Sequence, residues 1–179
     1  VTLAPERASL QAIARLAAAG VVVAAGHSNA TQAQITEALA HGLRGFTHLF
    51  NAMSPLQSRE PGVVGAALAD PDSWCALIVD GWHVHPVTLR VALAAKRHER
   101  FMLVTDAMPS VGTDMASFQL QGRRIAVVDG RCVDDQGTLS GSALDMASAV
   151  RNAVALLGLP LETAARMAST YPAEFLGLG

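Results

Sequence analysis

Short apolar runs alternate with longer amphipathic segments along this chain, and the alternation leaves few folds open. The runs are continuously hydrophobic, which is typical of parallel strands buried on both faces. They predict five strands, at residues 1–3, 21–25, 45–47, 76–79 and 101–104. Strands that alternate with helices predict an α/β fold with a parallel sheet.

Helix signals fill the gaps between the runs. Residues 9–19 carry apolar side chains at helical spacing, Thr31 begins a capping box, and Pro86 suits a first helical position. We expect the last two helices at residues 142–157 and 161–168. Residues 118–134 break the alternation and predict a small β-hairpin inserted after the fifth strand and before these last helices.

The length of the chain bears on the kind of sheet. A complete (β/α)₈ barrel takes about 250 residues, whereas this chain has 179. Five strand–helix units are too few to close a barrel. The pattern alone therefore leaves two folds open, a doubly wound open sheet and a partial barrel whose first strands lie upstream.

Polar side chains follow the predicted strands at their carboxyl ends, where parallel α/β folds carry their active sites. His27 and His48 follow adjacent strands, 21 residues apart, so that two neutral imidazoles can share a divalent metal ion. Asp106 follows the fifth strand and can act as a proton acceptor beside the metal. Each residue taken alone also fits a plain hydrogen-bonding role, as do Asp80 as a loop cap and Asn51 as a turn residue.

Several other functions are weakened by what the sequence contains. The only lysine, Lys96, lies in a predicted helix end, which argues against a Schiff-base aldolase with a lysine on a strand. Residues 137–142 are glycine-rich and precede a predicted helix, so their backbone N–H groups are a candidate anion site. Arg59 lies in a polar loop, where a solvated arginine is the simpler interpretation.

Charge and cysteine content point away from other classes of partner. The net charge is −2 with no run of like charges, which favours neither nucleic acid nor a membrane surface. No apolar run reaches the roughly 18 residues of a membrane span, and no signal peptide is predicted. Two cysteines without a CxxC motif indicate a reducing, cytoplasmic setting.

Seven segments together resemble a known family. They are VTLAPE (1–6), AGHSNAT (25–31), THLFNAM (47–53), REPG (59–62), DGWHVH (80–85), LVTDA (103–107) and GTLSGS (137–142). In this order and spacing the chain resembles the N-acetylglucosamine-6-phosphate deacetylases of the amidohydrolase superfamily. The resemblance implies an α/β fold in which residues 1–179 form a partial (β/α)₈ TIM barrel, about strands 4–8, without the N-terminal strands and the β-sandwich.

The resemblance also implies a role for each matching residue. His27 and His48 match metal ligands, and Asp106 matches the catalytic aspartate. Positions that hold the substrate are matched by Asn51, Ala52, Arg59, His83 and Leu139. Within this set Arg59 is expected to reach across a homodimer interface, and Leu139 to border the acetyl group.

The implied activity is metal-dependent hydrolysis of the acetamide of N-acetylglucosamine 6-phosphate to glucosamine 6-phosphate and acetate. The expected cofactor is a divalent metal, Zn²⁺ first, with Fe²⁺, Co²⁺ or Mn²⁺ as alternatives. The family's third ligand, a Glu on an upstream strand, and its carbonyl-polarising histidine have no match in these 179 residues. Two alternatives therefore stay open: another amidohydrolase acting on a different acylated or cyclic amide, and an inactive fragment that lacks the third metal ligand.

Overall fold

The computed structural model describes residues 1–178, and its centre is a five-stranded parallel sheet. The strands are β1 (Thr2–Leu3), β2 (Val23–Ala25), β3 (Leu43–Phe46), β4 (Trp74–Ile78) and β5 (Phe101–Val104). Their order in the sheet is their order in the chain, β1-β2-β3-β4-β5. A doubly wound sheet reverses its strand order at a switch point, so this order favours a section of a barrel.

Helices connect the strands and follow the sheet. They are α1 (Leu10–Ala18), α2 (Gln32–Ala40), α3 (Gly62–Ala69), α4 (Pro86–Ala95), α5 (Met146–Leu157), α6 (Leu161–Ala168) and α7 (Thr170–Leu176), with short 3₁₀ turns η1 (Pro5–Arg7) and η2 (His98–Arg100). The capping box of α2 is confirmed, because the Thr31 hydroxyl accepts from the Gln34 N–H and the Gln34 side chain accepts from the Thr31 N–H. None of the helices within residues 1–178 has the length and apolar character needed to cross a membrane.

The helix predicted at residues 142–157 begins later than expected. Ser142 is the last residue of a strand, and α5 starts at Met146, where the Asp145 side chain accepts from the Ser148 N–H. The expectation that residues 137–142 stand at a helix start is therefore wrong, because Leu139–Ser142 form a strand.

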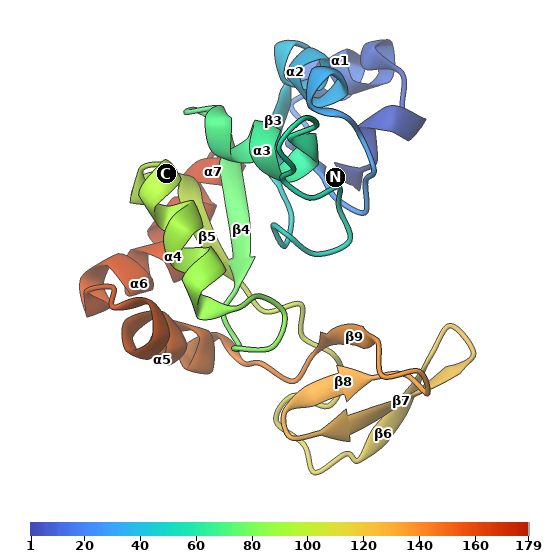
Figure 1. Ribbon diagram of the computed structural model, residues 1–179, viewed down its shortest axis with the longest axis vertical. Helices are drawn as coiled ribbons and strands as arrows, with labels where there is room; N and C mark the ends of the chain where they lie inside the picture. Colours follow the sequence, from blue (N-terminus) through green and yellow to red (C-terminus); the bar gives the residue numbers. More distant parts are fainter. Residues whose placement is uncertain (179) are drawn as a thin grey trace.

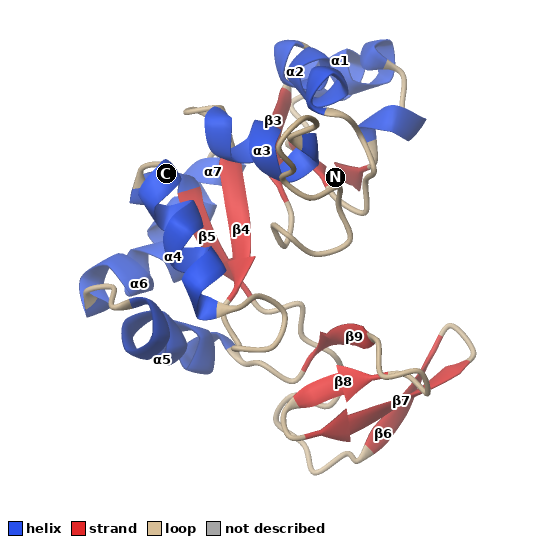
Figure 2. Ribbon diagram, viewed as in Figure 1, coloured by secondary structure: helices blue, strands red, loops and turns tan. Residues whose placement is uncertain are grey.

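The predicted hairpin is part of a larger antiparallel sheet. Strands β6 (Ser117–Leu120), β7 (Arg123–Val128), β8 (Arg131–Val133) and β9 (Leu139–Ser142) pair in this order. Asp129 and Gly130 form the predicted turn between β7 and β8. Figure 1 shows this sheet, which we call the insert, standing apart from the helices and joined to β5 and α5 by two chain segments. Figure 2 shows that the insert consists of strands and loops alone.

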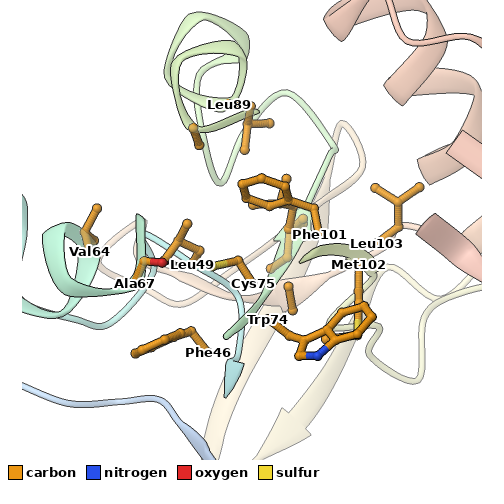
Figure 3. Packing of buried hydrophobic residues seen from close by; sticks show 14 of the residues in the cluster. Phe46, Leu49, Val64, Ala67, Trp74, Cys75, Leu89, Phe101, Met102 and Leu103 are labelled. Atoms are coloured by element: carbon orange, nitrogen blue, oxygen red, sulfur yellow. Dashed lines mark hydrogen bonds between the residues drawn. The ribbon is translucent and has the colours of Figure 1, made fainter. Parts of the chain in front are cut away.

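The core lies between the parallel sheet and the helices. Figure 3 shows Leu49, Cys75 and Phe101 gathered between α3 and α4, which contribute Val64, Ala67 and Leu89. Lys96 ends α4 as expected and is buried, and its ammonium donates to the Ala67 carbonyl and the Ser73 hydroxyl, both at 2.9 Å. This lysine fastens the end of α3 to the start of β4 and is remote from the carboxyl ends of the strands.

The other face of the sheet is apolar and is capped by α7. A cavity of about 230 Å³ lies there between strand residues and α7, lined by Thr2, Ala24, Phe46, Thr47, Ala76, Met102, Val104, Pro172, Phe175 and Leu176. Gly45 permits this contact, because a Cβ there would stand 2.8 Å from the Phe175 ring. The sheet ends at β1 on one side and β5 on the other, so neither edge is paired within residues 1–178.

Candidate active site

The predicted site residues meet at the carboxyl ends of the strands. His27, His48 and Asp106 each lie two residues beyond the end of β2, β3 and β5 respectively. All three line one cavity of about 790 Å³. Its walls are His27, His48, Asn51, Ala52, His83 and Asp106 on the barrel side, and Met108, Leu120 and residues 137–141, Leu139 among them, on the insert side.

The backbone is unusual at the three residues that carry the chemistry. His27, His48 and Asp106 have φ angles of +50°, +28° and +51°. Positive φ is uncommon outside glycine and costs energy, so it persists only where the surrounding structure enforces it, often at functional sites. Here it turns each side chain out of the strand direction and into the shared cavity.

The two histidines converge on one point. Their Nε2 atoms are 3.0 Å apart, and the rings meet edge to face with centroids 4.8 Å apart. Two imidazoles that bind one zinc ion at 2.0–2.1 Å bring their nitrogens to roughly 2.9–3.3 Å for angles between a right angle and the tetrahedral value. The spacing of this pair therefore fits a shared metal ion.

His48 is the better enclosed of the two. It is 7 % exposed, and burial lowers its pKa below the ordinary value, which favours the neutral imidazole that a metal requires. The charge of His27 acts in the same direction, and that of Asp106 opposes it. The Nδ1 atom of His48 is buried and has no hydrogen-bond partner among residues 1–178.

The loop after His27 is fixed by Glu6, which lies in the VTLAPE segment. Both carboxylate oxygens of Glu6 are used, one accepting from the Ser28 hydroxyl at 2.6 Å and one from the Asn29 N–H at 2.8 Å. Burial raises the pKa of Glu6, but the hydrogen bonds outweigh burial and hold this pKa below its ordinary value. Glu6 therefore supports the loop and is not the third ligand of the histidine pair.

Asp106 is held by β9 of the insert. The Ser142 N–H donates to the Asp106 carbonyl at 2.8 Å, the Met108 N–H donates to the Ser142 carbonyl at 2.9 Å, and the Ser142 hydroxyl donates to the Thr105 carbonyl. Gly141 lies against the same segment, with no room for a Cβ beside Met108. These supports are formed by residues distant in sequence, and only the GTLSGS segment hinted at them.

The remaining predicted residues divide into two groups. Asn51 lines the cavity and also closes its own turn, since its amide donates to the His48 and Leu49 carbonyls at 3.1 and 3.3 Å. His83 lines the cavity and bonds to Asp80. Arg59 lies in an exposed loop and is not part of the cavity wall.

The metal donors present are fewer than a complete site needs. Within residues 1–178 there is no group of three or more His, Cys, Asp or Glu side chains arranged to hold a metal ion. His27 and His48 supply two nitrogen donors of the kind that zinc and related divalent metals prefer. The structure thus provides part of a metal centre with a carboxylate, Asp106, beside it.

Comparison with known proteins identifies the class. The sequence model of the Amidohydrolase family matches residues 6–179, and the chain belongs to this family. The parallel strands carry polar side chains at their carboxyl ends, as the strands of a barrel do. The prediction of a partial barrel is confirmed.

Within this class the chain is similar to the sugar-phosphate deacetylases. It is 49 % identical over 177 residues to the N-acetylgalactosamine-6-phosphate deacetylase of Shewanella sp. (strain ANA-3), covering 98 % of this chain and 45 % of that protein. It is 37 % identical over 181 residues to the N-acetylglucosamine-6-phosphate deacetylase of Haemophilus influenzae, covering 99 % and 47 %. The crystal structure of the N-acetylglucosamine-6-phosphate deacetylase from Pasteurella multocida matches with a TM-score of 0.95 at 40 % identity, covering 99 % and 46 %. The chain thus spans about half the length of these relatives.

Proposed function

We propose that residues 1–179 are part of the catalytic barrel of a deacetylase that hydrolyses the acetamide of N-acetylglucosamine 6-phosphate. The products are glucosamine 6-phosphate and acetate. The observation that carries the proposal is the convergence of the two Nε2 atoms, 3.0 Å apart, in a cavity that also contains Asp106. The similarity to the N-acetylhexosamine-6-phosphate deacetylases supports this choice of substrate among amidohydrolase reactions.

His27 and His48 would hold a divalent metal ion, with Zn²⁺ proposed first and Fe²⁺, Co²⁺ or Mn²⁺ as alternatives that suit the same donors. When bound, such a metal activates water and polarises the amide carbonyl. Amidohydrolases are in general metal-dependent, which supports this assignment. A third ligand would come from outside residues 1–178, as the donor count requires.

Asp106 would move the proton. Its carboxylate accepts a proton from the attacking water as the new C–O bond forms, and it returns this proton to the nitrogen as the C–N bond breaks. The amine then leaves as a neutral group, and the acetyl group leaves as acetic acid, which loses its hydroxyl proton to the solvent and becomes acetate. The backbone bonds to Ser142 keep Asp106 at the cavity while it does so.

The other cavity residues would hold the sugar phosphate. His83, Asn51 and the backbone at Ala52 would bind its polar groups, and Leu139 would contact the acetyl methyl group. Arg59, which is not part of this cavity's wall, would serve the site of a partner subunit in a homodimer. Contacts remote from the reacting amide orient it and lower the entropic barrier.

Replacement of Asp106 by Asn tests the proposed function. Asn tolerates positive φ, so the variant should fold, and the loss of the proton acceptor should reduce kcat about 10²–10⁴-fold. The assay measures acetate release in the complete protein, by which we mean the longest natural polypeptide that contains this chain. Metal content measured in parallel should not change, and turnover at the wild-type rate would exclude Asp106 as the base.

A second substrate is favoured by one specific comparison. The Shewanella relative, at 49 % identity, is an N-acetylgalactosamine-6-phosphate deacetylase. The two sugars differ only in the configuration at C4, so the same residues could perform the same reaction on either. Comparison of kcat/KM for the two epimers in the complete protein decides between them.

A cytoplasmic location belongs to the same proposal. Both cysteines are free and buried, which agrees with a reducing compartment.

A further inference from the structure

Asp80 and His83 form a closely bonded pair in the loop between β4 and α4. The Asp80 Oδ2 atom is 2.6 Å from the His83 Nδ1 atom. The side chains are 7 % and 6 % exposed, respectively. A pair this short and this enclosed fixes the position of both side chains.

The hydrogen bonds of Asp80 determine where the His83 ring carries its proton. The Asp80 Oδ1 atom accepts from the Trp82 and His83 N–H groups at 2.8 and 2.9 Å. Burial raises the pKa of Asp80, but the bonds from His83 and Trp82 outweigh it and hold the pKa below its ordinary value. An ionised carboxylate only accepts hydrogen bonds, so Nδ1 of His83 carries a hydrogen.

The other ring nitrogen of His83, Nε2, is open to a ligand. The Nε2 atom has no hydrogen-bond partner within residues 1–178, and it is not buried. His83 belongs to the wall of the cavity that contains His48 and Asp106. Nε2 is therefore the atom with which His83 can contact a ligand.

We propose that Asp80 is a positioning residue for the substrate's phosphate group, acting through His83. This inference rests on the proposed function. The ionised oxygens of a phosphate group accept hydrogen bonds and do not donate them. Because Asp80 keeps a hydrogen on Nδ1, His83 can bind a phosphate oxygen through Nε2 only as an imidazolium, and Asp80 balances its charge. The pair thus presents a fixed, charge-assisted donor to an anionic group and none to an unphosphorylated sugar.

The substitution Asp80→Asn separates this role from loop capping. The Asn Oδ1 can still accept from the Trp82 and His83 N–H groups, so the turn is retained. Its NH₂ group then faces Nδ1 of His83 and must donate to it, which moves the ring hydrogen to Nε2. Asp80→Ala removes both the turn hydrogen bonds and the contact with His83. Asp145→Asn is the matched control, because the Asp145 carboxylate accepts from the N–H and hydroxyl of Ser148 and bonds to no histidine.

The first measurement is the tautomer of His83 by long-range ¹H–¹⁵N NMR at a pH where the ring is neutral. We expect Nδ1–H in the wild type and in Asp145→Asn, and Nε2–H in Asp80→Asn. Titration with glucosamine 6-phosphate should then give both His83 nitrogens a hydrogen in the wild type only. An Nδ1–H tautomer in Asp80→Asn, or binding of this probe without a change at His83, would overturn the inference.

The second measurement is kinetic and uses the complete protein. We expect Asp80→Asn to raise KM for N-acetylglucosamine 6-phosphate about tenfold or more with little change in kcat, and to leave KM for N-acetylglucosamine unchanged. An equal rise for both sugars would reduce Asp80 to a structural residue. If the wild type hydrolyses neither sugar, the proposed function fails, and the glucosamine 6-phosphate titration alone then decides the role of Asp80.

Discussion

At the scale of single residues, the site depends on close contacts around the strand ends. Gly141 has a φ of +77°, and a Cβ placed there would stand 2.4 Å from Cγ of Met108 and 3.1 Å from the carbonyl oxygen of Asp106. A side chain at this position would therefore push on the segment that carries the proposed base. Gly122 in the same insert has a φ of +79° and open space around it.

We expect Gly141→Ala to lower the free energy of unfolding by more than Gly122→Ala does. Both variants incur the cost of a left-handed backbone, about 1–2 kcal/mol, and only Gly141→Ala adds a clash. Urea unfolding measures the difference, and the acetate assay should show a loss of kcat for Gly141→Ala alone. Equal effects of the two substitutions would mean that the Met108 contact relaxes without moving Asp106.

The sequence was informative about site residues and silent about their supports. His27, His48, Asp106 and His83 could be found because strand periodicity places them at one edge of the sheet. Their positive φ angles, and the support of Asp106 by Ser142, could not be found this way. Such features depend on contacts between distant segments, and no local pattern encodes them.

At the scale of elements, the insert forms one wall of the cavity and contacts the barrel through an arginine–tryptophan pair. The Arg131 guanidinium of β8 lies 4.5 Å from the centroid of the Trp82 ring, in the loop that also carries Asp80 and His83. Trp82 is 51 % exposed, so the contact lies at the surface. A cation–π contact at an exposed site contributes about 0.5–1 kcal/mol.

A double-mutant cycle tests whether this pair joins the two elements. Arg131→Met and Trp82→Leu should each destabilise the protein, and the double variant should be less destabilised than their sum by about 0.5–1 kcal/mol. Arg123→Met is the control, since Arg123 lies on the neighbouring strand β7 without an aromatic partner and should show no coupling to Trp82. Additive effects for Arg131 and Trp82 would show that this pair does not couple the insert to the barrel.

The elements that sequence patterns missed share a physical reason. Helix α3 was not predicted because most of it is buried and apolar on every side, so it has no amphipathic period to detect. Helix α7 is short and contains Pro172. Strand β9 has Gly141 within it and pairs with β8 and with the segment around Ala107, so its strand character comes from tertiary contacts and not from propensity.

At the scale of the whole molecule, the sheet is a section of a barrel. Its strands follow one another in order, β1 and β5 leave open edges, and α7 lies against an apolar face between them. This architecture could be predicted because the five-fold alternation of strands and helices, the chain length and the matching motifs all point to it. The chain spans about half the length of its relatives, and chains of their length have room for all the strands of a barrel.

Metal affinity is the property that most depends on the whole molecule. Catalytic zinc sites use three protein ligands, and residues 1–178 bring two histidines together with no third donor in a metal-binding group. We therefore expect the 179-residue chain to lose its zinc on dialysis and to show no deacetylation, whereas the complete protein should retain about one zinc ion per site. Elemental analysis after dialysis measures the difference, with His27→Ala in the complete protein as the control that should also lose zinc. Stoichiometric zinc retained by the 179-residue chain would mean that its two histidines and water suffice, and the third-ligand requirement would fall.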